Sequence, residues 1–183
     1  MDPGHPLLTA TSLTLTPEGR NVEVADDSGH TVATLDASGA LRGPAGETLL
    51  ALRLEEPSGA RRDRPGAVQL HIADPGGATE LGTATVTKYG FGPRSKKLSL
   101  AVGDAVRFDV SDDRGTQLAI TAGGAEVGTL SIETIKKGFL RRARVYRLQI
   151  ASPPPPDLHA LVLGAAIGYE SMLDAALAAA MRD

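Results

Sequence analysis

Two segments of the chain carry clusters of basic residues. These are Lys88, Arg94, Lys96 and Lys97 in the first segment, and Lys136, Lys137, Arg141, Arg142 and Arg144 in the second. Glu80-Leu81-Gly82-Thr83 precedes the first cluster and the similar Glu126-Val127-Gly128-Thr129 precedes the second, which favours a duplicated hairpin unit. Clustered cations attract anionic head groups, with about 1 kcal/mol for each Lys or Arg near a membrane surface. The clusters therefore predict two basic hairpins that bind anionic lipid. The alternative is that the cations only keep exposed strand edges soluble.

Other arrangements give weaker indications of chemistry. The segment from Gly90 to Lys97 is rich in Gly and Lys, but it lacks the spacing of a phosphate-binding loop and no helix follows it. We interpret it as a hairpin connection. Asp109, Asp112 and Asp113 lack the alternating acids and the final Glu of a calcium loop, so they are expected to form a turn.

Residues that could support catalysis or metal binding are scattered. The four histidines have no spacing that would bring two to one face, and they are His5, His30, His71 and His159. His159 is expected to be packed or hydrogen-bonded. Glu170 and Asp174 are four residues apart and could form an acid pair, but they more simply mark where a helix leaves its enclosure. No nucleophile motif occurs, so we predict no catalytic residue, no metal, no cofactor and no enzymatic activity.

The composition is that of a globular protein without redox chemistry. Of 183 residues, 42% are hydrophobic and 22% are charged, and there is no Cys to form disulfides or ligate metal. The net charge of -3 and an aromatic content of 3% disfavour nucleic acid as a partner. Residues 1–6 lack the features of a secretory signal. We predict a cytoplasmic protein with a disordered tail at 1–6 and a single domain at 7–183.

Most of the chain has apolar residues at every second position, the pattern of strands with one buried face. The alternating sets are Val22 and Val24; Leu50, Leu52 and Leu54; Val68, Leu70 and Ile72; Leu98, Leu100 and Val102; Val106, Phe108 and Val110; Leu118 and Ile120; Leu130 and Ile132; Leu148 and Ile150. Clusters of Asp and Gly, such as Asp26-Asp27-Ser28-Gly29, separate them and are typical of hairpin turns. The pattern predicts about twelve antiparallel strands of ordinary length.

The C-terminal segment predicts the only long helix. The four prolines of Pro153–Pro156 end the last strand, and Asp157 is a suitable N-cap for a helix over residues 157–181. Ala160 to Gly168 is apolar without interruption, so no side of this half of the helix suits water. A membrane span needs about twenty apolar residues, and Glu170 interrupts the run too early. We therefore expect a helix buried in protein and no transmembrane span.

These two elements fit together as a barrel with a plug. A barrel of about eight strands fills its interior with side chains, whereas about twelve strands leave a central space of helical width. We predict a mainly β fold, a closed antiparallel barrel of about twelve strands around the C-terminal hydrophobic helix. The alternative is a β-sandwich with the helix across one open face.

The chain resembles the tubby C-terminal-like superfamily, in particular its LURP-one-related and scramblase-like members. The resemblance rests on the strand number, the Asp-x-x-Gly turns and the apolar helix that begins at Asp157-Leu158-His159-Ala160. It implies phosphoinositide-type head groups as ligands of a basic surface. The Cys cluster of scramblases is absent and residues 152–156 contain no acid, so calcium-driven lipid scrambling is not supported. The two functions weighed are therefore peripheral lipid binding and, as the alternative, a scaffold for a protein partner; a ligand site at the barrel mouth is a remote third.

Overall fold

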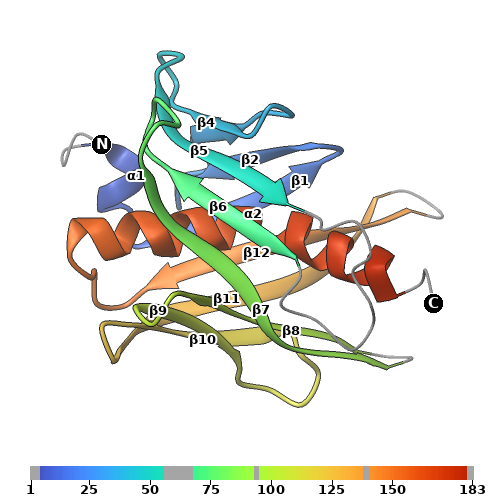
Figure 1. Ribbon diagram of the computed structural model, residues 1–183. Helices are drawn as coiled ribbons and strands as arrows, with labels where there is room; N and C mark the ends of the chain where they lie inside the picture. The colour runs from blue at the N-terminus through green and yellow to red at the C-terminus, as the bar shows by residue number, and fades with distance from the viewer. Residues whose placement is uncertain (1–4, 56–67, 93–94, 138–140, 181–183) are drawn as a thin grey trace.

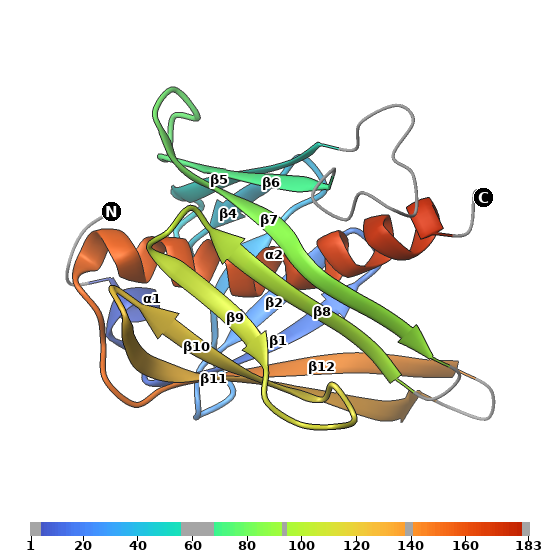
Figure 2. The same cartoon turned by 60° about the horizontal axis from the view of Figure 1, so that its bottom comes forward.

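The segments with alternating apolar residues form strands that pair in chain order. A computed structural model describes residues 5–55, 68–92, 95–137 and 141–180. Each strand pairs antiparallel with the next, and β1 (Ser12–Glu18) pairs with β12 (Arg141–Ile150) to close the barrel. Figures 1 and 2 show the strands wrapped around a single long helix. The predicted fold class, a twelve-stranded closed antiparallel barrel with a buried C-terminal helix, is thereby confirmed.

The strands differ in length, and the longest ones project beyond the rest of the barrel wall. The other strands are β2 (Asn21–Ala25), β3 (Thr31–Leu35), β4 (Ala40–Arg42), β5 (Thr48–Glu55), β6 (Gln69–Ala73), β7 (Glu80–Gly92), β8 (Ser95–Val102), β9 (Val106–Val110), β10 (Gln117–Ala122) and β11 (Ala125–Lys137). The two longest are β7 and β11, with 13 residues each. They and their partners β8 and β12 form hairpins that extend past the neighbouring strands.

Four tight connections share one construction, as the Asp-x-x-Gly sequences predicted. In each, the Gly N–H donates to the carbonyl oxygen of the Asp three residues earlier, as Gly29 does to Asp26 at 3.0 Å. Each of these glycines has a positive φ, which favours Gly over other residues. The Asp carboxylates accept backbone hydrogen bonds within the same turn; Asp112, for example, accepts from Arg114 and Thr116. The pairs are Asp26 with Gly29, Asp36 with Gly39, Asp74 with Gly77, and Asp112 with Gly115.

Helix α2 (Pro156–Ala180) runs through the barrel, one residue to the N-terminal side of the predicted span at each end. It is long and apolar enough to span a membrane by composition, but 78% of its most apolar stretch is buried inside the protein. Figure 1 shows the helix passing behind β5, β6 and β7. The prediction that this helix fills the barrel is therefore confirmed.

The helix packs most closely on β6 through two glycines. A Cβ atom added to Gly164 would lie 2.8 Å from Ile72 Cγ2, and one added to Gly168 would lie 2.2 Å from Leu70 Cδ2. Real Cβ atoms do not approach carbon so closely, so these positions allow the helix backbone to approach the sheet. Tyr169 is fully buried and donates its hydroxyl to the carbonyl oxygen of Leu98 at 2.8 Å, which joins the helix to β8.

The buried residues follow the predicted alternation over most of the barrel. The even-numbered sets are buried, except that Leu54, Val110 and Ile132 are only partly covered. The first and fourth strands instead bury odd-numbered residues, which are Leu13, Leu15 and Leu41. A short helix, α1 (Pro6–Thr9), precedes β1 and buries Leu7 completely, so the predicted tail has structure from its last residue onward. Residues 1–4 of that tail lie outside the described residues.

The barrel has two distinct ends, because connections in an antiparallel meander alternate between them. Connections after odd-numbered strands, including β7–β8 and β11–β12, lie at one end, which we call the ribbon end. Connections after even-numbered strands lie at the other, where β12 leads into α2, and we call it the entry end. The helix therefore runs from the entry end to the ribbon end, and Figure 1 shows the C-terminus there.

Candidate functional site

Eight of the nine predicted lipid-binding residues lie on two projecting hairpins. Strand β7 pairs with β6 only as far as Thr85, and β8 pairs with β9 only as far as Leu100. Beyond these residues, Lys88–Gly92 pairs with Ser95–Ser99, and neither segment has another strand partner within the described part of the chain. We call this two-stranded segment the first ribbon. It contains Lys88, Lys96 and Lys97 and no acidic residue, while Arg94 lies outside the described residues.

The second ribbon has the same construction. Strand β11 pairs with β10 as far as Ser131, and β12 pairs with β1 as far as Tyr146. Beyond them, Glu133–Lys137 pairs with Arg141–Val145 over five residue pairs. Five pairs extend about 15 Å at the rise of a β-strand. The cations of this ribbon are Lys136, Lys137, Arg141, Arg142 and Arg144, and its one acid is Glu133.

Both ribbons project from the ribbon end of the barrel. Their connections follow β7 and β11, two odd-numbered strands, so the topology requires it. Figures 1 and 2 both show the two hairpins extending toward the side where the C-terminal end of α2 lies. The two basic clusters, which begin at Lys88 and at Lys136, 48 residues later in the sequence, thus belong to one end of the molecule.

The pairing register of the second ribbon places cations opposite cations. Lys136 pairs with Arg142, and Lys137 pairs with Arg141. Like charges directly opposite each other in a sheet are destabilising, since Cβ atoms of such pairs are about 5 Å apart. At these positions neither strand pairs with a further strand among residues 5–55, 68–92, 95–137 and 141–180. The second ribbon thus places two pairs of like charges in register.

Arg144 differs from the other ribbon cations because it is bound within the protein. Its Nη1 donates to Glu170 Oε1 and Oε2 at 2.9 and 2.8 Å, and it lies 3.5 Å from Asp174 Oδ1. Burial lowers the pKa of Arg144, but the hydrogen bonds and charge of Glu170 outweigh this effect and raise it. The hydroxyl of Tyr146 also donates to Glu170 Oε2. Arg144 therefore anchors the ribbon to the helix.

This anchor changes the interpretation of the two helix acids. Glu170 does not mark the point where α2 leaves its enclosure, because Leu173, Ala175 and Ala176 beyond it are buried. Its carboxylate is held instead by β12. Asp174 has 62% of its side chain exposed, so the second half of the helix has a solvent-facing side at that position. The sequence could not reveal the pairing, since the strand that faces Glu170 depends on the barrel's closure.

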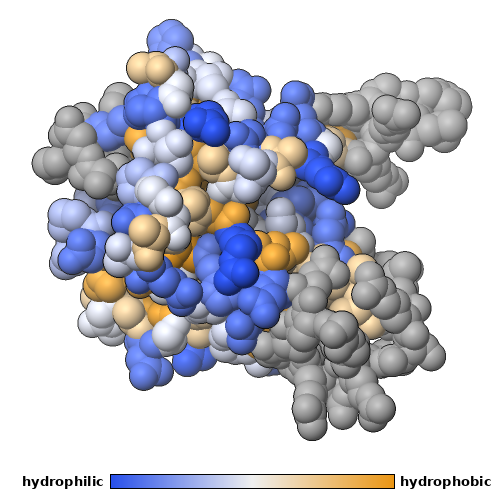
Figure 3. All heavy atoms as spheres, turned by 45° about the horizontal axis from the view of Figure 1, so that its top comes forward, coloured by the Kyte–Doolittle hydropathy of each residue, from blue (hydrophilic) through white to orange (hydrophobic). Residues whose placement is uncertain are grey.

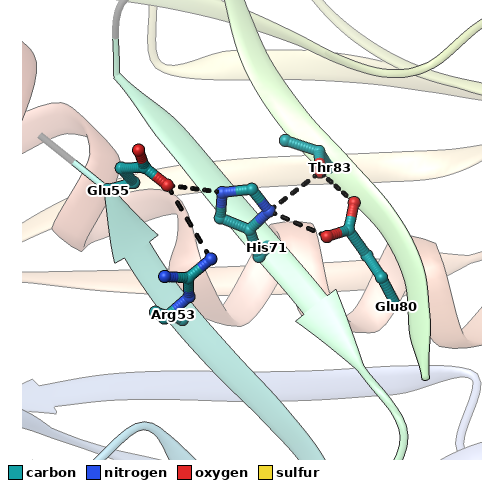
Figure 4. A network of polar contacts seen from close by, with 5 residues as sticks. All are labelled: Arg53, Glu55, His71, Glu80 and Thr83. Atoms are coloured by element: carbon teal, nitrogen blue, oxygen red, sulfur yellow. Dashed lines mark hydrogen bonds and ion pairs between the residues drawn. The ribbon is translucent and has the colours of Figure 1, made fainter. Parts of the chain in front are cut away.

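A second polar cluster lies on the outer wall, where sequence reasoning did not place a site. Leu70 and Ile72 of β6 face the core, so His71 between them faces outward. His71 Nε2 lies 3.1 Å from Glu55 Oε2, and Nδ1 lies 3.0 Å from Glu80 Oε2 (Figure 4). Arg53, 3.7 Å from Glu55, and Thr83 complete the cluster, which links β5, β6 and β7.

The outer cluster contains a hydroxyl, an imidazole and carboxylates, which are the groups of a catalytic triad. The hydrogen bond that Thr83 makes does not suit a nucleophile. Thr83 Oγ1 donates to Glu80 Oε1 at 2.5 Å, so its proton is directed away from His71. Both ring nitrogens of His71 lie within hydrogen-bond distance of a carboxylate, so the ring is held between Glu55 and Glu80. The hydrogen bond from Thr83, followed by that from His71, lowers the pKa of Glu80. The cluster is best understood as a clamp across three strands.

The ribbon end also holds a pocket of about 600 Å³ beside the second half of α2. This volume is typical of small-molecule sites. Its lining combines leucines with charged groups, and includes Leu35, Leu52, Leu54, Leu70, Arg20, Asp36, Arg53, Gly168, Ser171, Asp174 and Ala178. Figure 3 shows apolar patches among polar residues on the face that carries β4 and β5. The pocket could admit a small amphipathic molecule.

The remaining candidates have structural explanations. Among the residues described, no three His, Asp or Glu side chains are arranged to hold a metal ion. Asp112 caps its own turn, as predicted. His159 is 3% exposed and packed, its Nε2 has no hydrogen-bond partner among the residues that the structure describes, and burial lowers its pKa. Gly90–Gly92 and Ser95–Lys97 form paired strands of the first ribbon, as expected for a hairpin, and residues 93–94 between them lie outside the described residues.

The fold defines the class of this protein as a closed twelve-stranded antiparallel barrel with an internal C-terminal helix. Comparisons with protein-family models, with curated proteins and with solved structures found no match to the chain. The resemblance to the tubby C-terminal-like superfamily therefore stays a prediction that rests on the sequence.

Proposed function

We propose that this protein is a non-enzymatic module that binds anionic phospholipid surfaces through its two basic ribbons. The observation that carries the proposal is the backbone register of the second ribbon, in which Lys136 is the strand partner of Arg142 and Lys137 that of Arg141. Such pairs repel each other in the free protein. An anionic surface removes this repulsion, so the same residues that weaken the isolated ribbon favour binding.

The charges of the ribbons are sufficient for peripheral attachment. Setting aside Arg144, which Glu170 holds, seven ribbon cations remain against the single carboxylate of Glu133. Glu133 is itself paired with Arg147 at 3.2 Å. At about 1 kcal/mol for each Lys or Arg near an anionic membrane, engagement of most of these residues gives micromolar-range attachment that weakens with salt. The net charge of -3 does not oppose it locally, because exposed charges beyond about 10 Å are screened.

The tubby-like resemblance suggests phosphoinositide head groups as the preferred lipids and the cytoplasmic leaflet as the place of binding. A head group with several phosphates offers more charge per contact than phosphatidylserine. Preference among lipids follows from charge density in this proposal. No pocket shaped for one head group is required.

Vesicle co-sedimentation over a salt series tests the proposal. Vesicles of phosphatidylcholine with phosphatidylserine or a phosphoinositide should sediment the protein at low salt, and pure phosphatidylcholine should not. Reversing two facing cations, Lys136→Glu with Arg142→Glu, removes at least about 2 kcal/mol, which corresponds to roughly 30-fold weaker binding. The matched control reverses two cations of the barrel wall that have no partner in either ribbon, Arg42→Glu with Arg107→Glu, with the same change in net charge.

The control separates local from overall charge. Equal losses in both double variants would show that the ribbons have no special role, and absence of binding to any anionic vesicle at low salt would refute lipid binding. In the second case the scaffold alternative, in which a protein partner binds the same end, becomes the better explanation. Thermal unfolding of each variant establishes that the barrel is intact.

A further inference from the structure

The two ribbons are spaced for a surface rather than for a single small ligand. Strands β9 and β10 lie between β8 and β11 in the barrel wall. Three strand spacings amount to about 14 Å around the wall. Groups that bind one phosphate must all lie within hydrogen-bond distance of it, at about 3 Å. The ribbons thus form two separate contacts that point in the same direction.

The opposite end of the barrel carries the opposite charge. The connections after the even-numbered strands hold five acidic residues, and in the part of the chain that the structure describes they contain no Lys or Arg. Asp157 adds a sixth acid in the first turn of α2. The five are Asp26, Asp27, Glu47, Asp74 and Asp104. An anionic surface therefore repels the entry end while it attracts the ribbon end.

The helix dipole does not cancel this polarity. The C-terminal end of α2 lies at the ribbon end and contributes about half a negative charge, and its N-terminal end contributes about half a positive charge at the entry end. The ribbon end has seven ribbon cations besides Arg144, against Glu133 and the three acids of its other described connections, Asp36, Asp112 and Asp113. This excess of positive charge, and the six acids of the entry end, are each several times larger than the partial charges of the helix. The side chains thus determine the electrical polarity along the barrel.

From this polarity we infer that the protein docks end-on, with the barrel axis close to the membrane normal and the C-terminal end of α2 facing the lipid. The inference rests on the proposed function and adds its geometry and the class of partner. The partner is an extended anionic bilayer that both ribbons touch at once, and the second contact is strengthened because the first holds it nearby. A soluble phosphorylated head group can occupy only one ribbon.

Site-specific labels test the orientation, and the absence of cysteine in the chain makes single labels possible. Thr134→Cys places an environment-sensitive fluorophore on an exposed position of the second ribbon, and Ala125→Cys places it on an exposed position at the entry end. On phosphatidylserine vesicles with a head-group quencher, the label at position 134 should be quenched and that at 125 should not. Equal quenching at both positions, or stronger quenching at 125, would overturn end-on docking even though sedimentation still shows binding.

Two further measurements test whether an extended surface is needed. Neutralising the first ribbon, Lys96→Gln with Lys97→Gln, and the second, Lys136→Gln with Arg142→Gln, should each weaken vesicle binding, and the combined variant should lose about 100-fold or more. Soluble inositol trisphosphate should displace the protein no better than sodium chloride of equal ionic strength. Tight competition by inositol trisphosphate, or a combined variant no weaker than the single ones, would refute a two-contact surface. If the unmodified protein binds no anionic vesicle at low salt, the proposed function itself is refuted.

Discussion

Arg144 and Glu170 are joined by two hydrogen bonds, from Nη1 to both carboxylate oxygens at 2.9 and 2.8 Å. The pair connects β12, and with it the second ribbon, to the helix inside the barrel. Both side chains are little exposed, at 23% and 21%. A guanidinium and a carboxylate held at these distances with little access to water stabilise the fold mainly because either one alone would be an unpaired charge.

Glu170→Gln should destabilise the barrel by about 2–4 kcal/mol, because it removes the carboxylate that holds Arg144 and leaves only the exposed Asp174 at 3.5 Å near a largely buried charge. Denaturant unfolding measures the loss as a shift of the midpoint at unchanged slope. Asp174→Asn is the matched control, since Asp174 is 62% exposed and its change should stay within about 0.5 kcal/mol. Equal losses of unfolding free energy in the two variants would show that the Arg144–Glu170 pair does not contribute more to stability than the exposed Asp174 does.

Arg144→Gln should separate stability from lipid binding. Arg144 is held by Glu170, so its loss should lower the unfolding free energy as Glu170→Gln does. Its effect on vesicle binding should be smaller than that of Lys136→Gln, which removes a cation that faces Arg142. Co-sedimentation and denaturant unfolding of the two variants measure both quantities. A loss of binding in Arg144→Gln that exceeds the loss in Lys136→Gln, with stability unchanged, would instead place Arg144 among the lipid contacts.

The sequence predicted the barrel well and its polar interior poorly, for a physical reason. Alternation such as Leu50, Leu52 and Leu54 reports which face of a strand is buried, and the unbroken apolar run of α2 reports its enclosure. Neither reports which strand faces which side of the helix. Arg144 and Glu170 are 26 residues apart, and only the closed wall brings them together.

The same limit explains the other features that were not foreseen. The His71 clamp draws on three strands, and its members Glu55 and Glu80 are separated from His71 by 16 and 9 residues. The buried leucines have odd numbers at Leu13, Leu15, Leu35 and Leu41, and even numbers in most other strands, because β-bulges and connections of different lengths shift the count of residues. The two basic hairpins were visible as a repeated sequence, and the alternating topology shows that they share one end.

Alkaline pH should unfold the barrel through Tyr146 and Tyr169. Burial, and for Tyr146 also the neighbouring Glu170 carboxylate, raises the pKa of both phenols above the usual value near 10. The folded protein therefore keeps these protons at a pH where the unfolded chain loses them, so stability is complete below about pH 10 and falls as the pH rises. Tyrosinate absorbance during a pH titration should show delayed ionisation, which Tyr146→Phe should reduce. A titration unchanged by Tyr146→Phe would contradict this account.

Acid should weaken the β3–β4 turn through Asp36. Hydrogen bonds from Ser38 and then Arg42 lower the pKa of Asp36 to about 2. A lowered carboxyl pKa contributes stability that is present above the unfolded value near 4 and is lost as the pH falls toward 2. Carboxyl NMR titration should place the Asp36 midpoint near pH 2, and Ser38→Ala should move it upward. A midpoint near 4 in the unmodified protein would show that the turn does not hold the carboxylate.

Gly168→Ala should destabilise the protein even though it favours the helix. The substitution gains about 1 kcal/mol of helix propensity, but the new Cβ would lie 2.2 Å from Leu70 Cδ2. Leu70 is only 2% exposed, so its side chain has little room to move, and overpacking of a core costs about 1–3 kcal/mol. We expect a net loss of about 1 kcal/mol or more in denaturant unfolding. Ser171→Ala, on a partly exposed position of the same helix, should show the propensity gain alone. A Gly168→Ala protein as stable as Ser171→Ala would mean that the helix and β6 do not pack at this distance.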